Sequence, residues 1–357
     1  MVTLIDIAKM AGVSPSTVSN ILNERNNVGE ETKQRVLKII QETGYEPNYF
    51  ASSIRRRTTN MVAIVVEDLT IYTMPIVERI MAVLEDAGYK TILTNLRMYD
   101  KWQDTWYYDE IKLFSELRGA MTQLRPIKVE GVVYVGGHCR YLRILSEFKD
   151  MNLVVAYAIS KDNNIPSVVI DDEKGGYEVT DYLLKMGHTR IGVIGGVDEN
   201  LHTKMRLDGY QRALYEHGVV YNPNLVGYGD WLRHSGYEVA ARILKEEPTA
   251  IFCMNDYMAA GAYDYCNENG IRIPEDLSIV GYDNVELSEY LSPKLTTCQI
   301  SAGDIGRRAA EELLNKLQAD GKEAAETDDN DGRFDTQEKL VKIDCEVIYR
   351  DSVRKVT

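Results

Sequence analysis

The stretch "SPSTVSNILNERNNVGEETKQRV" (residues 14–36) predicts a short helix, a polar loop and the start of a second, longer helix. Ser14 is a good helix cap, and Pro15 suits the first helical position, where a missing N–H costs nothing. The apolar residues of the short helix fall on one side: Val18, Ile21 and Leu22. That side predicts packing against neighbouring helices.

Helical signals also flank this stretch. In "TLIDIAKMAGV" (3–13), Thr3 is followed three residues later by Asp6, which indicates a helix cap. Gly12 suits the left-handed turn that ends such a helix. The longer helix is expected at about residues 31–43, with Gly44 as its stop. Three short helices, with about three residues of turn between the first two, predict an all-α helix-turn-helix head.

The outer face of the short helix carries small hydrogen-bonding side chains: Ser16, Thr17, Ser19 and Asn20. Such residues near a helix N-terminus enter the major groove of DNA and meet base edges or phosphates. The alternative is an ordinary three-helix unit with a polar face. The next segment, "GYEPNYFASSIRRRTTN" (44–60), favours DNA, because Ile54 directly precedes three arginines. An apolar wedge beside a basic cluster is typical of minor-groove binding, although a basic linker with an incidental Ile is the simpler reading.

Composition sets the class of protein. The 357 residues carry a net charge of −14, whereas residues 1–60 hold eight basic and six acidic residues, a net of +2. A small head of that charge on an acidic body suits binding to a polyanion. The five cysteines show no CxxC spacing, so we expect buried free thiols and neither a metal site nor disulfides. No signal peptide or membrane-length apolar run is visible, which predicts a cytoplasmic protein.

From Met61 onward, apolar runs alternate with helical stretches, which predicts parallel strands. The runs fall into two sets: 61–67, 89–96, 130–137 and 153–159, then 190–196, 225–230, 250–256 and 277–284. Two sets predict two doubly wound parallel-sheet lobes, whose ligands bind beyond the carboxyl ends of the strands. No phosphate loop, HExxH or nucleophile elbow is present, so we expect neither an enzyme nor a cofactor.

Several motifs of this chain occur together in one known family: the head, "GYEPN", "GHTRIGVIGG", "RLDGYQRAL", "TAIFCMNDYMAAGAYD", "IPEDLSIVGYDN" and "LSPKLTT". In this order they resemble the lactose-repressor/galactose-repressor (LacI/GalR) family of bacterial transcription regulators. The resemblance implies a dimer that reads a near-palindromic DNA operator, with a two-lobed effector-binding core similar to periplasmic sugar-binding proteins. The expected parts are a head (1–47), a hinge (48–60), a first lobe (61–160 with 292–320), a second lobe (161–291 with 338–357) and a flexible acidic loop (321–337).

The resemblance also carries residue roles. In the head it implies base contacts from Pro15, Ser16 and Asn20 and a minor-groove wedge at Ile54. The full predicted DNA-binding set is Thr3, Ser14, Pro15, Ser16, Thr17, Ser19, Asn20, Ile54, Arg55 and Arg56. Arg55 and Arg56 are expected to supply the charge that many relatives carry where this chain has Ser52.

In the core, the resemblance implies an effector site at the strand ends: Asp68, Tyr72, His138, Tyr157, Arg206, Trp231, Asn255, Asp256 and Asp283. Arg, Asp and Asn offer hydrogen bonds to hydroxyl groups, and Trp offers a flat platform for a sugar ring. Tyr157 departs from the Asp of many sugar-binding relatives. The simpler readings are an ion pair between lobes for Arg206 and Asp283, a helix cap for Asp256 and a core aromatic for Trp231.

The prediction is therefore a repressor whose operator affinity changes when an effector, a sugar by the chemistry above, shifts the two lobes. A neutral sugar favours induction over co-repression. The rivals are a binding-only sugar receptor, a regulator that answers to a protein partner, and an enzyme. The aromatic-rich stretch 97–112 is open: Tyr99, Trp102 and Trp106 form part of the pocket or an oligomer contact, or they pack against their own lobe.

Overall fold

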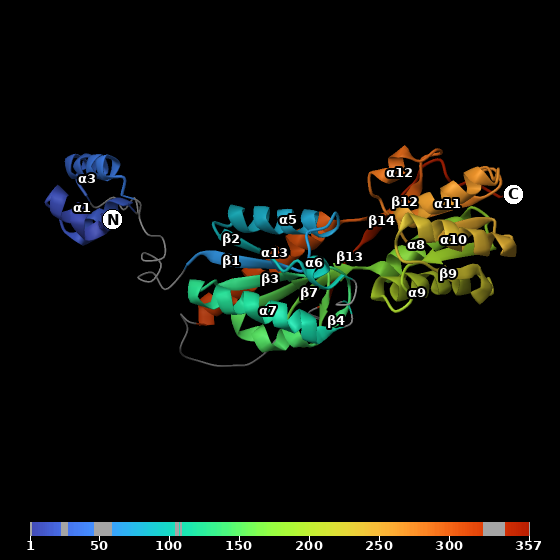
Figure 1. Ribbon diagram of the computed structural model, residues 1–357, viewed down its shortest axis with the longest axis horizontal. Helices are drawn as coiled ribbons and strands as arrows, with labels where there is room; N and C mark the ends of the chain where they lie inside the picture. Colours follow the sequence, from blue (N-terminus) through green and yellow to red (C-terminus); the bar gives the residue numbers. More distant parts are fainter. Residues whose placement is uncertain are drawn as a thin grey trace. The chain divides into compact units, whose positions relative to one another are not determined.

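The computed structural model describes residues 2–22, 28–45, 59–103, 107, 109–323 and 340–356. It divides into two compact units, Met1–Thr59 and Asn60–Thr357, which Figure 1 shows with their helices and strands.

The first unit is the predicted helix-turn-helix head. Its helices are α1 (Leu4–Ala11), α2 (Pro15–Leu22) and α3 (Glu30–Thr43). A shared apolar core joins them: Ile7, Ala8, Ala11, Val18, Ile21 and Val36 are buried. Gly12 and Gly44 end α1 and α3 in the left-handed conformation, with φ of 65° and 61°. The three residues between α1 and α2 match the predicted turn.

The second unit contains two lobes, each built on a sheet of six described strands. The first sheet is parallel throughout and has the order β13-β7-β5-β3-β1-β2. Its strands are β1 (Met61–Val66), β2 (Lys90–Asn95), β3 (Gly131–Val135), β5 (Leu153–Ala156), β7 (Ser167–Ile170) and β13 (Leu340–Ile343). Every residue of β1 and β3 is buried, as expected for strands covered on both faces.

Helices cover both faces of this sheet (Figure 1). Helices α5 (Thr73–Asp86) and α13 (Ala302–Glu323) pack against one face. Helix α7 (Glu110–Leu124) and the 3₁₀ segment Ile144–Met151 pack against the other. The short helix α6 (Met98–Trp102) lies after β2, and β4 (Tyr141–Leu142) pairs with β6 (Ile159–Ser160) in a small separate sheet.

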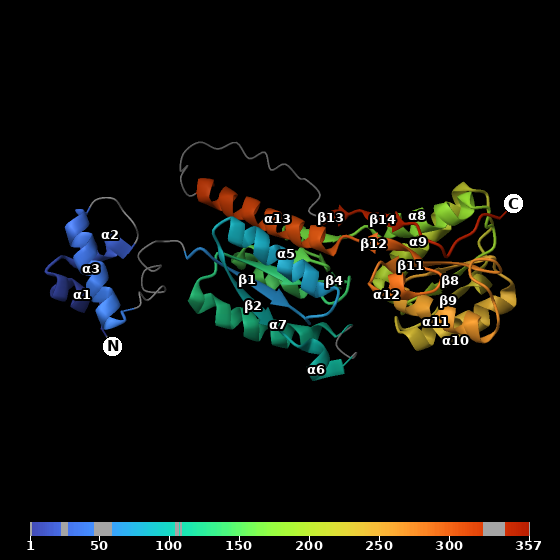
Figure 2. The ribbon, with the colours of Figure 1, turned by 90° about the horizontal axis from the view of Figure 1, so that it is seen from above.

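The second sheet has the order β14-β12-β11-β10-β8-β9, and only the β12/β14 pair is antiparallel among these described strands. Its strands are β8 (Ile191–Gly195), β9 (Val226–Tyr228), β10 (Ala250–Cys253), β11 (Ser278–Asp283), β12 (Thr296–Ile300) and β14 (Cys345–Ile348). In Figure 2, helices α8 (Asp172–Lys185) and α9 (Leu201–Glu216) lie on one side of the sheet. Helices α10 (Arg233–Ile243) and α11 (Asp256–Glu268) lie on the other, and the short α12 (Leu287–Tyr290) follows β11.

The predicted lobe boundaries need correction, because several strands belong to the other sheet. The described chain passes between the lobes at 170–172, 300–302 and 343–345. Hence 161–170 belongs to the first lobe, not the second, because β7 pairs with β5 and β13. Strand β12 lies in the second lobe, not the first, because it pairs with β11. The C-terminal segment is shared, since β13 joins the first sheet and β14 the second.

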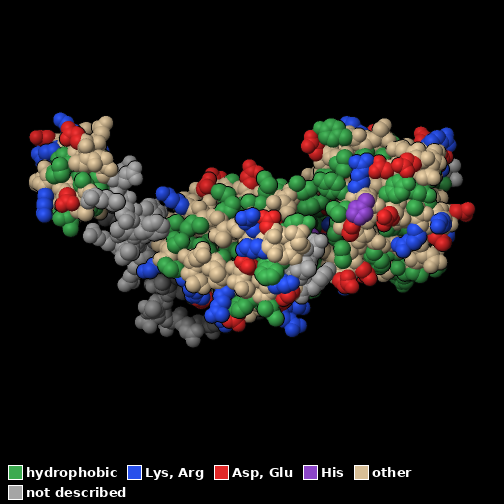
Figure 3. Space-filling model, viewed as in Figure 1, with side chains coloured by type: hydrophobic (Ala, Val, Ile, Leu, Met, Phe, Trp, Pro, Cys, Tyr) green, Lys and Arg blue, Asp and Glu red, His purple; other side chains and the backbone are tan. Residues whose placement is uncertain are grey.

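Further expectations concern the cysteines, the acidic loop and membrane-spanning segments. All five cysteines are free and buried, as predicted. Helix α13 continues to Glu323, so the start of the predicted acidic loop is helical, and its remainder lies outside the described residues. No helix in the described part of the chain is both long and apolar enough to cross a membrane. Basic and acidic side chains are interspersed over the face of the second unit seen in Figure 3.

Candidate functional site

The polar end of α2 is the candidate DNA-reading face. Ser14 caps the helix, since its Oγ accepts the Thr17 N–H at 3.1 Å. The same oxygen lies 2.7 Å from Ser16 Oγ and 2.8 Å from Thr17 Oγ1. Pro15 and Ser16 are exposed, while Ser19 and Asn20 are half-buried. The start of α2 therefore presents hydroxyl and backbone N–H groups, which suit phosphates and base edges.

The remaining predicted DNA contacts are Thr3 in the head and three residues of the hinge. Thr3 forms a capping box: its hydroxyl donates to Asp6 Oδ2 at 2.6 Å, and its Oγ1 accepts the Asp6 N–H at 3.3 Å. Thr3 is nevertheless exposed, so its role toward DNA stays a prediction. Ile54, Arg55 and Arg56 lie outside the described residues.

In the second unit, most predicted effector residues follow strand ends, and Arg206 lies at their centre. Arg206 is 2% exposed, and its Nε donates to Asp172 Oδ1 at 2.7 Å. Its Nη2 lies 3.7 Å from Asp283 Oδ1, and Nη1 donates to the Met254 carbonyl. The guanidinium stacks on Tyr282, 3.7 Å from the ring centroid. A buried cation between two carboxylates and an aromatic face is a satisfied and rigid arrangement.

Tyr72 and Asp283 join the two lobes. The Tyr72 hydroxyl, at the start of α5, donates to Asp283 Oδ2 at 3.0 Å at the end of β11. Burial raises the pKa of Asp283 to about 6, while Arg206 acts to lower it. Asp283 and Asn284 have φ of 100° and 53°, conformations that cost energy for residues with a side chain. The surroundings must therefore hold this turn in place.

Arg350 holds the turn that carries Asp283. Its Nη2 donates to Asn284 Oδ1 at 2.8 Å, and its Nη1 donates to the Leu295 carbonyl at 2.8 Å and to Ser288 Oγ at 3.1 Å. These bonds fasten the end of β11 to β14 and α12. The C-terminal segment thus positions a residue of the cleft.

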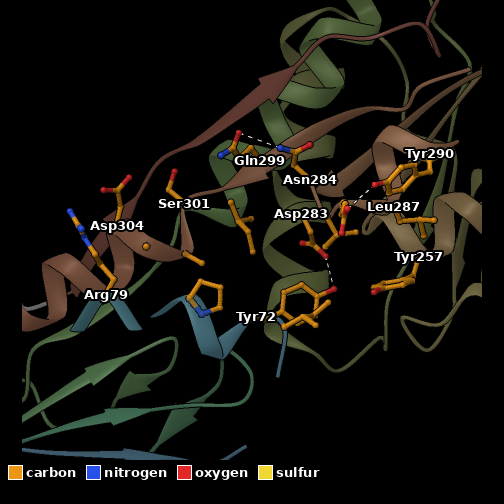
Figure 4. A pocket seen from close by; sticks show the side chains of 17 residues that line it. Tyr72, Arg79, Tyr257, Asp283, Asn284, Leu287, Tyr290, Gln299, Ser301 and Asp304 are labelled. Carbon is orange, nitrogen blue, oxygen red and sulfur yellow. Dashed lines mark hydrogen bonds between the residues drawn. The ribbon is translucent and has the colours of Figure 1, made fainter. Parts of the chain in front are cut away.

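A cavity of about 1050 Å³ opens beside the Tyr72–Asp283 contact (Figure 4). Tyr72 and Arg79 line it from the first lobe, and Asp283 lines it from the second. The crossover Gln299–Asp304 forms a further wall. Of the nine predicted effector residues, Tyr72 and Asp283 line this cavity, because the lobes close over Arg206 and its neighbours.

Two further predicted residues lie beside this network. Tyr157 is 6% exposed, and its ring centroid lies 5.2 Å from that of His202. Trp231 packs its ring over Gly196, where an added Cβ would lie 2.1 Å from the indole. The Arg206 guanidinium lies 5.8 Å from the Trp231 ring centroid. The predicted Arg, Tyr and Trp are therefore brought together.

Two predicted residues, Asn255 and Asp256, make contacts that hold the fold. Asn255 is the cap of α11, accepting the Met258 N–H at 2.8 Å and donating to the Trp231 carbonyl at 2.9 Å. Asp256 accepts the Thr297 hydroxyl at 2.6 Å with one oxygen and the Val285 N–H at 2.8 Å with the other. Both carboxylate oxygens of Asp256 are thus engaged inside the second lobe. The cap of α11 is Asn255, and not Asp256 as the simpler reading had it.

The remaining first-lobe residues also have protein partners. The Asp68 carboxylate accepts the Tyr99 N–H at 3.0 Å, and burial raises the pKa of Asp68 to about 6. His138 lies edge-on to Tyr107, with 4.5 Å between ring centroids. Burial, followed by the neighbouring His202 and Arg140, lowers the pKa of His138 to about 3, so this imidazole is neutral.

The aromatic-rich stretch packs partly onto its own lobe. Trp102 contacts the core formed by α7 and the sheet, and Lys112 Nζ lies 5.3 Å from the Trp102 ring centroid. Tyr99 is 48% exposed, and Tyr107 reaches His138. Trp106 lies outside the described residues. For Trp102 the contacts support the simpler reading.

Sequence reasoning missed Asp172 and His202, which complete the network around Arg206. His202 Nδ1 lies 2.6 Å from Asp172 Oδ2. Burial favours the neutral acid, yet Arg206 and His202 hold the pKa of Asp172 below its usual value. Two signals existed: Asp172 lies two residues after the apolar run 167–170, and His202 precedes Arg206 by four residues, on the same helix face.

Both units match known protein families. Residues 3–48 match the pattern described as "Bacterial regulatory proteins, lacI family", and residues 180–353 match "Periplasmic binding protein-like domain". The chain is 30% identical to the "HTH-type transcriptional repressor PurR" of Histophilus somni (strain 129Pt), over 99% of both chains. It is 34% identical to the protein of that name from Pasteurella multocida (strain Pm70), over 91% of this chain and 95% of the relative.

Solved structures show the same fold. The lac repressor dimer bound to operator and the anti-inducer ONPF matches with a TM-score of 0.78 and 21% identity, over 99% of both chains. The complex of the regulator CelR with cellobiose matches with a TM-score of 0.64 and 26% identity, over 99% of this chain and 100% of that one. With relatives that cover nearly its whole length, the protein belongs to the lacI family and is a DNA-binding transcriptional repressor, not an enzyme.

Proposed function

We propose that the protein binds a near-palindromic DNA operator as a homodimer, and that a small polyhydroxylated effector, a sugar, controls operator affinity from the cleft between the lobes. The observation that carries the proposal is Arg206, buried between Asp172 and Asp283 where the two lobes meet. Charged groups with fixed geometry at the carboxyl ends of parallel strands suit recognition of hydroxyl groups. The solved complex of CelR with cellobiose gives a precedent for a sugar on this fold.

The mechanism follows from contacts that cross the cleft. Tyr72 of the first lobe and Asp283 of the second bond to each other in this arrangement. An effector that engages Asp283 must replace or extend that contact, and so it binds one lobe arrangement better than another. Only this differential affinity shifts the lobe equilibrium and, through it, operator affinity. For a neutral sugar we propose induction.

A thermal-shift screen tests the effector class. The probes are mono- and disaccharides, sugar phosphates, and purine bases and nucleosides. A ligand at 100 times its Kd stabilises the folded state by about 2.7 kcal/mol. We expect a sugar hit that disappears in Asp283→Ala and persists in Asp264→Ala, whose carboxylate forms a surface ion pair with Arg233. A hit with purines alone, or no hit from a chain that binds its operator, would overturn the sugar assignment.

A DNA selection tests the operator. Random-sequence duplexes recovered with the full-length protein should converge on a near-palindrome. Ser16→Ala combined with Asn20→Ala should then lose affinity for that sequence. Gln34→Ala combined with Glu42→Ala is the matched control, because these residues are exposed on α3. Equal affinities for the two double variants would contradict the assignment of α2.

The homodimer has its own test. Exposed apolar side chains gather before and at the start of α5: Leu69, Ile71 and Met74 are 41%, 55% and 56% exposed. An exposed apolar cluster of this kind is a surface that a second copy would cover. Sedimentation of the wild-type chain should give a dimer, and Met74→Asp should weaken it. A monomer at micromolar concentration would refute the dimer without bearing on the effector.

A further inference from the structure

A second hydrogen bond between the lobes lies on the far side of Arg206 from Tyr72. The backbone N–H of Cys139, after β3 in the first lobe, donates to Nε2 of His202 in the first turn of α9 at 3.2 Å. Cys139 and His202 are 2% and 4% exposed. This contact therefore forms inside the junction of the lobes, away from solvent.

The partners of His202 fix its protonation. A backbone N–H only donates, so Nε2 must be the acceptor and carries no proton. The single ring proton is then on Nδ1, which donates to Asp172 Oδ2 at 2.6 Å. The second oxygen of Asp172 accepts Nε of Arg206 at 2.7 Å. One fully buried carboxylate thus sets the tautomer of His202 and the position of Arg206.

These contacts form one continuous chain of polar groups. It starts at Tyr72 in the first lobe, passes through Asp283, Arg206, Asp172 and His202 in the second, and returns to the first at the Cys139 N–H. The chain therefore joins the two lobes at both of its ends, and the His202–Cys139 bond is its far contact. A change at Arg206 reaches the far contact through a single side chain, Asp172.

The far contact is shielded from water. Cys139, Ile159 and Val169 of the first lobe form a small apolar cluster, and Leu201 of α9 packs against it. The Tyr157 ring covers another side of His202. In such surroundings a hydrogen bond is strengthened, and a donor that faces another donor is costly.

We propose that Asp172, His202 and the Cys139 N–H form an interlobe latch, in which Asp172 is a positioning residue that couples closure of the lobes to the position of Arg206. The latch deepens the proposed function and rests on it, since it assigns regulation to the same cleft. It also gives His202 a role that depends on its tautomer, which mere packing would not require.

The sharpest test is a pair of His202 variants that leave the buried Arg206–Asp172 pair intact. In His202→Gln, the longer carboxamide places an acceptor where Nε2 stood and keeps the bond to Cys139. In His202→Asn, the shorter side chain reaches Asp172 but falls short of Cys139. The latch thus predicts closed lobes for Gln and opened lobes for Asn, although both side chains are neutral amides.

A third variant tests the role of Asp172. In Asp172→Asn, Arg206 takes the amide oxygen, because it is a donor, and the amide NH₂ faces Nδ1 of His202. The imidazole must then move its proton to Nε2, which points a donor at the Cys139 N–H. Adding His202→Gln to this variant removes the tautomer conflict and should restore closure.

The lobe arrangement is read by pulsed electron spin resonance on the full-length chain. Nitroxides are attached at Ile111→Cys and Val220→Cys, whose parent residues are 82% and 87% exposed on different lobes, while the native cysteines are buried. Loss of one hydrogen bond should lower the ratio of closed to open lobes about tenfold in His202→Asn and Asp172→Asn. In ¹⁵N-histidine NMR, the His202 signal, identified by its absence in His202→Gln, should show a protonated Nδ1 in the wild type and a protonated Nε2 in Asp172→Asn.

Each outcome decides the proposal. Equal distance distributions for His202→Gln and His202→Asn would overturn it, and so would an unchanged His202 tautomer in folded Asp172→Asn. If Asp172→Asn fails to fold, the two His202 variants still give a decision. Because neither readout uses an effector or an operator, failure of the proposed function would leave this result standing.

Discussion

Gly209 is a position where a single added methyl group should disturb the two helices beside the cleft. It lies in α9 opposite α8, and an added Cβ would stand 2.0 Å from the Glu173 carbonyl oxygen and 2.6 Å from the Tyr177 nitrogen. Both are backbone atoms, so no rotamer change relieves the clash. Gly209→Ala therefore forces α8 and α9 apart by about 1 Å, because packed atoms do not interpenetrate. The same two helices carry Asp172 and Arg206.

The magnitude follows from three contributions. Overpacking costs about 1–3 kcal/mol. Stretching the charge-assisted bond between Arg206 and Asp172 costs about 1.5–3 kcal/mol. The better helix propensity of Ala returns about 1 kcal/mol. We expect Gly209→Ala to lower the free energy of unfolding by about 3 kcal/mol in total.

Gly119→Ala is the matched control. Gly119 is also inside a helix, α7, but an added Cβ there would meet nothing within 4 Å. Only the propensity gain remains, about 0.5–1 kcal/mol of stabilisation. Urea unfolding followed by circular dichroism should place the two midpoints on opposite sides of the wild type. If Gly209→Ala proves as stable as Gly119→Ala, the inferred helix contact is wrong.

Four further outcomes are expected. Asn20→Ala should weaken operator binding by about tenfold to a hundredfold in a gel-shift titration, because one base contact is worth about 1–3 kcal/mol, while the melting temperature stays unchanged. Effector affinity should fall as the pH drops through about 6, where Asp283 becomes neutral and loses its attraction to Arg206, and Asp283→Asn should flatten that calorimetric profile. Because the folded-state pKa of Asp283 lies above its ordinary value, its contribution to stability should decline as the pH rises from about 4 to about 6, which acid-range unfolding curves of wild type and Asp283→Asn would reveal. Arg350→Gln should destabilise the second unit by about 1.5–3 kcal/mol in urea and weaken effector binding, because the turn at Asn284 loses charged hydrogen bonds.

Local sequence patterns were sufficient for most elements of the fold. The eight predicted apolar runs all contain strands, and central strands such as β1 and β3 are apolar along their whole length because they are covered on both faces. Of the strands that were missed, β12 and β13 lack this signal, whereas β7 is buried at every position and carries it. Strand β12 contains two buried threonines, and β13 alternates between exposed and half-buried residues at a sheet edge. The lobe boundaries failed because only pairing assigns a strand to a sheet, as it does for β7 and β12.

The sequence predicted those residues of the candidate site whose location follows from their place in the fold. Trp231 and Asp283 lie at or after strand ends that converge at one edge of a parallel sheet, and Arg206 of α9 lies near both side chains. Asp256 follows a strand end as predicted, but its two carboxylate oxygens accept hydrogen bonds from Thr297 and Val285. No local sequence pattern reveals these two bonds. Asp172 and His202 were missed because they lie on two different helices and are 30 residues apart in sequence.

The strength of the closing contacts limits which effectors can switch the protein. Loss of the His202 contact changes the ratio of closed to open lobes by about tenfold, and loss of the bond from Tyr72 to the Asp283 carboxylate costs about 1.5–3 kcal/mol. Reversal of a two-state equilibrium from 1:99 to 99:1 requires about 5.5 kcal/mol of differential affinity. An effector that touches only Asp283 therefore binds without switching, and a full switch requires contacts with several groups of the network at once. A fragment such as a single polyol should thus stabilise the fold yet leave operator affinity nearly unchanged, whereas a ligand that spans Arg206 and Asp283 should change both. Operator release by the fragment at saturation would show that the closed arrangement is weaker than its contacts imply.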